Sequence, residues 1–206
     1  MKLYFRYIFP WLWDKFISKS FPRKKRREIL AAAEGKILEI GLGTGLNLPE
    51  YPSRIKKITT VDSNPGMNPY AQKRAESSHK KVEHHTITAE KLPMSDQTFD
   101  TVVSTWTLCS IAKPNEALKE IHRVLKTGGK FIFIEHGLSR KPHIQKWQKR
   151  LTPLWKIFGD GCHIDRDMKK LITAQPFELT QYKEYCMPKM TRLASQMYQG
   201  IAIKKG

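Results

Sequence analysis

Three glycines at alternate positions follow a short apolar run, and an acid stands just before them. The run covers residues 36–40 and contains Glu39, and the glycines are Gly41, Gly43 and Gly45. An apolar run of this length bounded by glycines predicts a buried central strand. Glycines at a strand end let backbone N–H groups approach a ligand that a Cβ atom would block. We therefore expect this acid and these glycines to belong to a binding site.

The glycine spacing distinguishes two kinds of nucleotide site. A dinucleotide fingerprint needs G-x-G-x-x-G, which places a pyrophosphate on a helix N-terminus. The third glycine would have to stand at position 46 or 48, and those positions hold Leu46 and Leu48. The spacing therefore does not support a dinucleotide site.

A second carboxylate follows the next apolar run. Asp62 comes directly after residues 57–61, and Ser63 stands beside it. A carboxylate at a strand end accepts strong hydrogen bonds from ribose hydroxyls. The stretch Asp-Ser-Asn-Pro is also ordinary turn chemistry. We favour the ribose role because Asp62 follows the glycine loop in the order that a nucleotide site requires.

These side chains must be positioned by alternating strands and helices. The expected strands are 36–40, 57–61, 82–88, 99–105, 130–135, 177–187 and 196–204, and the expected helices are 66–81 and 115–125. Alternation of this kind predicts parallel strands with right-handed crossovers, followed by a terminal antiparallel hairpin. In such a sheet a ligand lies beyond the carboxyl ends of the strands. Residues 139–176 are an expected insertion.

The glycine loop resembles the E-x-G-x-G-x-G loop of class I S-adenosylmethionine-dependent methyltransferases. Residues 88–100 resemble the family's D-A-E-x-L-P-F-x-D-x-x-F-D stretch, and the similarity extends from about residue 36 to 136 and to residues 197–203. The resemblance implies an α/β, Rossmann-like seven-stranded sheet in the order 3-2-1-4-5-7-6 with strand 7 antiparallel. It also implies S-adenosyl-L-methionine as the cofactor.

The resemblance implies a role for each matching residue. Glu39 would bind the ammonium of the methionine moiety, Asp62 and Ser63 the ribose, and Ala89 and Glu90 the adenine. Thr88 stands where the family usually has Asp, which weakens the expected adenine contact. Residues that would face the methionine moiety or the methyl acceptor are Thr105, Trp106, His136 and His163.

Short blocks point to a narrower group. Within the superfamily, the chain resembles the type 11, quinone-biosynthesis-like branch. Residues 107–111, 134–136 and 160–163 resemble the thiol methyltransferase-like proteins of endoplasmic reticulum and lipid droplets. The acceptor implied is a small or lipid-like molecule: a thiol, a quinone-like compound or a phospholipid.

Methyl transfer from a sulfonium is an in-line displacement, so the protein's main task is to align the reactants and exclude water. A thiolate needs little further help, whereas a phenol or an amine needs a base nearby. His136 and His163 are the histidines available for that role. We interpret both as lining the acceptor site rather than as catalytic, and the catalytic residue is left open.

Composition narrows the remaining choices. A chain of 206 residues suits one α/β domain with small additions. The three cysteines, Cys109, Cys162 and Cys186, have no C-x-x-C spacing, so we expect reduced thiols, no metal and a cytoplasmic location. The net charge of +18 favours an anionic partner, either a phospholipid surface or nucleic acid.

The N-terminus forms a distinct segment. Residues 1–30 combine aromatic side chains with the basic run 23–27 and precede a methyltransferase domain at 31–206. Two interpretations are open: an amphipathic cap that packs Trp13, Phe16 and Ile17 on the domain, or a segment that lies peripherally on an anionic membrane. Residues 139–176 would form a substrate lid. Its aromatic and basic stretch 147–158 would combine with the N-terminal aromatics into an apolar entrance rimmed by positive charge.

The sequence therefore predicts a methyltransferase acting on a small-molecule or lipid-like acceptor. One alternative is a nucleic-acid methyltransferase, although no N-P-P-Y or D-P-P-Y tetrapeptide follows residues 99–105. A second is a protein that binds S-adenosylmethionine without turnover, which Thr88 favours because a fold does not by itself establish activity. The acceptor's identity and the oligomeric state stay open.

Overall fold

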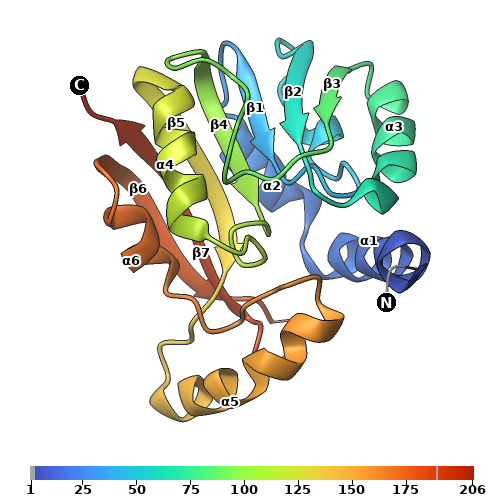
Figure 1. Cartoon of the computed structure of the whole chain (residues 1–206), viewed down its shortest axis with the longest axis vertical. Helices are drawn as coiled ribbons and strands as arrows, with labels where there is room; N and C mark the ends of the chain where they lie inside the picture. Colours follow the sequence, from blue (N-terminus) through green and yellow to red (C-terminus); the bar gives the residue numbers. More distant parts are fainter. Residues whose placement is uncertain (1–2, 189) are drawn as a thin grey trace.

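The computed structural model describes residues 3–188 and 190–206 and contains one twisted seven-stranded sheet (Figure 1). The strands are β1 (Ile37–Ile40), β2 (Lys57–Val61), β3 (Lys81–His85), β4 (Phe99–Thr105), β5 (Leu125–His136), β6 (Phe177–Cys186) and β7 (Gln196–Lys204). Their order is β3-β2-β1-β4-β5-β7-β6, and β7 pairs antiparallel with both neighbours. The predicted strand order and the antiparallel seventh strand are confirmed.

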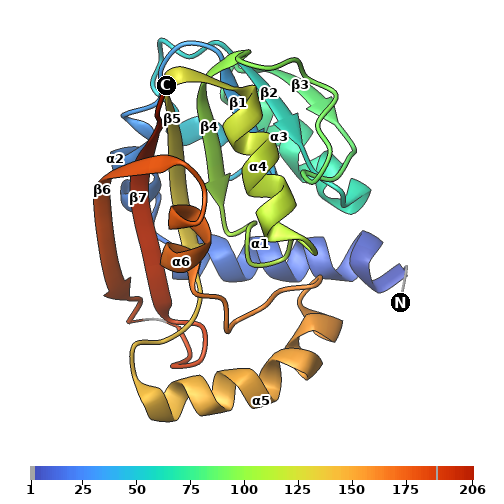
Figure 2. The ribbon, with the colours of Figure 1, turned by 60° about the vertical axis from the view of Figure 1, so that its left-hand side comes forward.

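Helices cover both faces of the sheet, which is why the central strands are buried on both sides (Figures 1 and 2). They are α1 (Phe9–Ser20), α2 (Arg23–Leu30), α3 (Asn68–Ser77), α4 (Pro114–Val124), α5 (Pro142–Phe158) and α6 (Met168–Thr173). Short turns of other helix types cover Tyr4–Ile8, Leu48–Glu50 and Pro65–Met67.

Two apolar clusters form the core, one on each face. Side chains of α4 and α6 pack with Leu38, Val102 and Phe131 on one face. Side chains of α1, α2 and α3 pack with Ile37 and Val103 on the other. Successive strand residues thus alternate between the two clusters, as the pleat of a strand requires.

Some predicted boundaries are wrong. The helix expected at 66–81 is α3. It begins only at Asn68, after a short turn capped by Asn64, and it ends at Ser77, before His79 with φ +53°. The strand expected at 82–88 is β3, which covers only Lys81–His85. The helix expected at 115–125 ends at Val124, and β5 begins at Leu125, earlier than the strand expected at 130–135.

The N-terminal segment is helical and packs on the domain. Ile17 is 2% exposed, but Phe16 is 43% exposed, so the predicted packing of Phe16 is wrong. Phe16 lies at the edge of the apolar stripe, while Trp13 and Ile17, four residues apart, face inward. Residues 1 and 2 of the predicted segment lie outside the described residues. Within residues 3–188 and 190–206, no helix is long and apolar enough to span a membrane.

Candidate active site

A cavity of about 350 Å³ lies beyond the carboxyl ends of β1, β2 and β4. It is bounded by the glycine loop, by the loop after β3, by α1 and by the turn Gly159–Gly161 after α5. This is the crevice where a doubly wound sheet binds its ligand. The structure thus brings the predicted cofactor residues other than Glu39 and Gly45 into the wall of one cavity.

The glycine loop forms the floor of the cavity. Gly41, Gly43 and Gly45 have φ of +72°, +55° and +80°, a conformation that other residues rarely adopt. A Cβ on Gly41 would come within 2.0 Å of the Thr107 side chain, whereas a Cβ on Gly43 would meet nothing within 4 Å. Gly41 and Gly43 line the cavity, so the space above Gly43 is free for a ligand. Gly45 instead packs beside Ala71 and does not reach the cavity wall.

Asp62 lies at the end of β2 and is held by two backbone groups. Gly43 N donates to its Oδ2 at 2.7 Å, and Asn64 N donates to its Oδ1 at 2.8 Å. Burial raises the pKa of Asp62 above its usual value, although these two hydrogen bonds oppose the shift. Ser63 follows and also lines the cavity. The carboxylate is therefore fixed in orientation before any ligand arrives.

Glu39 lies beneath the cavity rather than in its wall. Its carboxylate is 1% exposed and accepts hydrogen bonds from Asn47 Nδ2 at 2.8 Å and Tyr51 Oη at 2.9 Å. Burial raises the pKa of Glu39 to about 7. Asn47, which also donates to Thr105 Oγ1 at 2.9 Å, lines the cavity together with Arg26. Glu39 therefore reaches the cavity through Asn47, a residue that the sequence did not single out.

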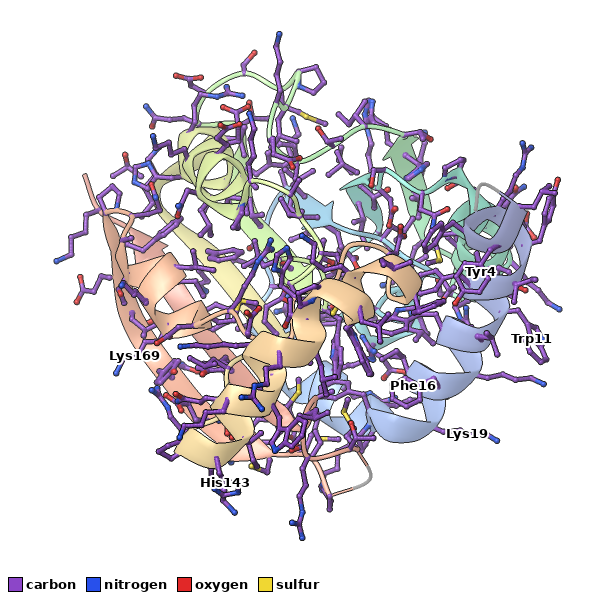
Figure 3. All side chains as sticks on the ribbon, turned by 60° about the horizontal axis from the view of Figure 1, so that its bottom comes forward. Tyr4, Trp11, Phe16, Lys19, His143 and Lys169 are labelled. Carbon is purple, nitrogen blue, oxygen red and sulfur yellow. The ribbon has the colours of Figure 1, made fainter. Side chains whose placement is uncertain are left out.

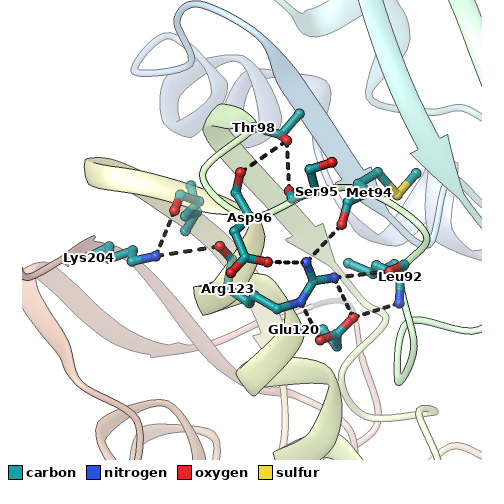
Figure 4. Close-up of polar contacts among 9 residues, drawn as sticks. Leu92, Met94, Ser95, Asp96, Thr98, Glu120, Arg123 and Lys204 are labelled. Carbon is teal, nitrogen blue, oxygen red and sulfur yellow. Dashed lines mark hydrogen bonds and ion pairs between the residues drawn. The ribbon is translucent and has the colours of Figure 1, made fainter.

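The loop after β3 forms the opposite wall. Thr88, Ala89 and Glu90 line the cavity, as predicted for an adenine-binding loop. Arg123 of α4 holds the continuation of this loop by donating to Leu92 O at 3.0 Å, Met94 O at 2.8 Å and Asp96 Oδ1 at 2.7 Å (Figure 4).

Glu120, one turn earlier on α4, completes the clamp. It accepts from Leu92 N at 2.7 Å and pairs with Arg123 at 2.7 Å (Figure 4). Because a guanidinium donates in several fixed directions, a single arginine can fix an irregular loop. The helix α4 thereby positions the residues expected around the adenine.

Trp106 closes the side of the cavity next to β4, where Thr105 also lines the wall. Its backbone has φ +57°, and such strained conformations persist only when the surroundings hold them. Here the buried Glu135 holds the following loop, because it accepts from Ser104 Oγ at 2.7 Å and Thr107 N at 3.0 Å. The indole packs against His136, with ring centroids 5.0 Å apart.

Neither predicted histidine lies in the cavity wall. His136 is 1% exposed and lies behind Trp106. His163 lies beyond the turn that lines the cavity, and its ring faces Asp165 at 3.7 Å. Of the three residues expected to contact the acceptor, the structure thus brings only Trp106 to the cavity.

The helix α1 supplies a further part of the cavity wall. Phe9, Trp13 and Ile17 line the cavity. Asp14 accepts from Thr44 Oγ1 at 2.6 Å and pairs with Arg74 at 2.8 Å, which ties the helix to the glycine loop. The sequence predicted that N-terminal aromatic side chains form part of an apolar entrance, and the structure places Phe9 and Trp13 in the cavity wall.

A second tether joins the turn after α5 to the segment after β2. Asn64 Nδ2 donates to Asp160 Oδ2 at 2.9 Å, and both residues line the cavity. No feature of the sequence indicated this pair, because its members come from distant segments. The cavity is therefore covered by two elements outside the central strands, α1 and the turn after α5.

Comparisons with known proteins agree with this geometry. A family model described as a methyltransferase domain matches residues 38–133. The thiol S-methyltransferase TMT1B of Rattus norvegicus is 36% identical over 188 residues, which cover 84% of this chain and 76% of the rat protein. A phosphatidylethanolamine N-methyltransferase of Cereibacter sphaeroides is 29% identical over 75% of each chain.

A solved structure shows the same fold. The YcgJ protein from Bacillus subtilis matches with a TM-score of 0.72 at 16% identity, over 89% of this chain and 97% of that one. A structural match at 16% sequence identity shows only that the fold is shared. The matching family model and the rat relative support the methyltransferase activity. The chain therefore belongs to the class I S-adenosylmethionine-dependent methyltransferases.

Proposed function

We propose that this methyltransferase uses S-adenosyl-L-methionine to methylate the sulfur of an apolar thiol that reaches the cavity from an anionic membrane surface. The observation that carries the proposal is the composition of the cavity. Its wall combines the glycine loop and the fixed carboxylate of Asp62 with the aromatic side chains of Trp106, Phe9 and Trp13. A polar cofactor and an apolar acceptor would meet in this cavity.

The residues present fit the cofactor. The open space above Gly43 accommodates a ligand next to backbone N–H groups, and the Asp62 carboxylate is oriented for ribose hydroxyls. Glu39 and Asn47 offer negative and polar groups for the methionine ammonium. Ala89 and Glu90 remain in place for the adenine. When bound, the cofactor supplies an electrophilic methyl group.

The chain's own contribution is alignment and exclusion of water. Aromatic and aliphatic side chains from α1 and Trp106 would hold an apolar acceptor against the bound cofactor. A thiol suits this wall because its thiolate needs no base once it is formed. The named activity of the rat relative, a thiol S-methyltransferase, supports the same acceptor class.

The outer surface supports delivery from a membrane. Within residues 3–188 and 190–206, the large apolar side chains that are exposed all belong to the N-terminal helical segment or to α5. They are Leu3, Tyr7, Ile8, Trp11, Leu12, Phe16, Trp147, Leu154, Trp155, Ile157 and Phe158. We call this set the α1–α5 face. Contiguous exposed apolar side chains of this kind mark interaction sites.

Two further observations concern this face. The helices α1 and α5 lie on one side of the molecule, where Trp11 and Lys19 project outward from α1 (Figure 3). Tyr4 Oη, in the short turn before α1, donates to Phe158 O at the end of α5 at 3.2 Å. Exposed basic residues lie among the apolar ones, namely Lys15, Lys19, Lys146, Lys149, Arg150 and Lys156. Apolar area combined with positive charge favours binding to anionic lipid.

A methyl-transfer screen tests the proposal. The purified chain is incubated with the cofactor labelled in its methyl group and with alkyl thiols, quinols, phosphatidylethanolamine vesicles or RNA. We expect label in the thiols, with kcat/KM rising with alkyl chain length. Transfer only to quinols, lipid amines or RNA would reject the thiol assignment. Lack of transfer to any acceptor by a chain that binds the cofactor would favour a non-catalytic binding protein.

A further inference from the structure

Two cysteines and a histidine from three separate segments meet behind the cavity. The Sγ atoms of Cys109 and Cys162 and a ring nitrogen of His136 lie within 4.8 Å of one another. Cys109 belongs to the loop after β4, His136 ends β5, and Cys162 follows the turn after α5. All three residues are buried, with 1%, 1% and 2% of their surfaces exposed.

Hydrogen bonding inside the protein accounts for only part of this cluster. His136 Nε2 lies 3.1 Å from Cys162 Sγ. A thiol is a weak hydrogen-bonding group, so it compensates poorly for burying an imidazole. The arrangement therefore favours a stronger ligand for these three side chains than they provide to one another.

The donor set matches a soft divalent metal. Two thiolates and a neutral imidazole are the three protein ligands of one known type of zinc site, with a non-protein ligand in the fourth position. Two thiolates also balance the charge of Zn²⁺, which makes the buried ion acceptable. Sulfur ligands disfavour Mg²⁺ and Ca²⁺, which prefer oxygen.

We propose that Cys109, His136 and Cys162 form a zinc site that fixes the acceptor wall of the cavity. The sequence predicted no metal because no two cysteines have the spacing of a metal motif, and only the fold brings these residues together. The site would join the loop that carries Trp106 to β5 and to the Gly159–Gly161 turn, and both Trp106 and this turn line the cavity. Its existence does not depend on which acceptor the enzyme uses.

Metal content of the full chain tests the site. After reconstitution with zinc and removal of excess ion, elemental analysis of the wild type is expected to give about one zinc per chain. Cys109→Ser, Cys162→Ser and His136→Gln should each lose most of it. Cys186→Ser is the matched control, because Cys186 is exposed and lies outside the cluster. Circular dichroism shows which variants have kept the fold.

A second measurement needs no variant. Replacing zinc by Co²⁺ in the wild type should produce the near-ultraviolet charge-transfer band of thiolate ligation and visible bands of a tetrahedral ion. Absence of zinc after reconstitution, or zinc that persists in folded Cys162→Ser, would overturn the proposal. A wild-type mass lower by two hydrogens, showing a Cys109–Cys162 disulfide instead of metal, would overturn it too.

Discussion

The backbone N–H of Gly43 donates a 2.7 Å hydrogen bond to Oδ2 of Asp62, so the glycine loop and the end of β2 are joined directly. The same bond fixes the carboxylate and the loop conformation together. The glycine loop and Asp62 therefore act together, and a change at Asp62 also affects the conformation of the loop.

Replacing Asp62 with Ala should weaken cofactor binding by about 1–3 kcal/mol, because a charge-assisted hydrogen bond is lost. Ser63→Ala tests the other expected ribose contact, and it should weaken binding less because Ser63 lines the same cavity without joining the loop to β2. Isothermal titration calorimetry measures both variants. Equal affinity for wild type and Asp62→Ala would refute the ribose assignment.

Glu39 should make the stability of the ligand-free protein depend on pH. Burial raises its pKa in the folded state to about 7, from an ordinary value of 4.5, so the folded state favours the protonated acid. The stabilisation that protonated Glu39 gives to the folded state is fully present below the pKa of Glu39 in the unfolded chain. It is lost as the pH rises through the folded-state pKa of about 7. Relative to Glu39→Gln, the wild type should lose up to about 3 kcal/mol across this window. Denaturant titrations of both proteins at several pH values measure the difference.

Cofactor binding should reverse the preference of the folded protein for protonated Glu39. A bound ammonium favours the ionised carboxylate, so binding near pH 7 should release protons from the wild type but not from Glu39→Gln. Calorimetry in two buffers of different ionisation enthalpy detects the release. Identical proton release by both proteins would show that Glu39 does not sense the cofactor.

The contacts of Arg123 predict that a substitution outside the cavity wall lowers both the stability of the fold and the affinity for the cofactor. Arg123→Ala removes the donors to Leu92 O, Met94 O and Asp96, and should lower the free energy of unfolding by about 1–3 kcal/mol. It should also weaken cofactor binding, because the loop carrying Ala89 and Glu90 loses its support. Lys119→Ala, an exposed change on the same helix, is the control. Unaltered cofactor affinity in the folded variant would mean that the clamp does not position the loop.

The α1–α5 face predicts binding to anionic vesicles. The double variant Trp11→Ser/Leu12→Ser should bind vesicles containing phosphatidylserine at least about tenfold more weakly than wild type, since apolar area available for insertion is lost. Its turnover of a short water-soluble thiol should be unchanged, which distinguishes a surface role from a damaged site. Sedimentation with vesicles measures the binding, and equal sedimentation of variant and wild type would exclude this face as the contact.

Local patterns predicted the parts of the molecule that depend on neighbouring residues. The run 57–61, the run 99–105 and the run 196–204 are strands with those bounds because their apolar, β-branched composition suits a buried sheet. The spacing of the glycines likewise predicted a ligand-binding loop and excluded a dinucleotide fingerprint, whereas its assignment to S-adenosylmethionine came from the family resemblance. The complete strand order followed from the family resemblance rather than from periodicity.

The remaining features depend on contacts between distant segments. Glu39 contacts Asn47 and Tyr51 rather than the cavity, which no spacing rule could show. His136 lies behind Trp106 because β5 extends past the last residue of β4 that pairs with it. The pairing of Asn64 with Asp160 joins residues 96 positions apart. Such contacts follow from the tertiary fold and leave no local signal.

The most direct test of the central claim is a crystal structure of the chain with S-adenosylmethionine or its demethylated product. We predict that the adenosine lies over Gly43 with its ribose hydroxyls on the Asp62 carboxylate, and that the sulfur points toward Trp106. Electron density for the ligand outside this cavity, or an empty cavity at saturating ligand, would contradict the account.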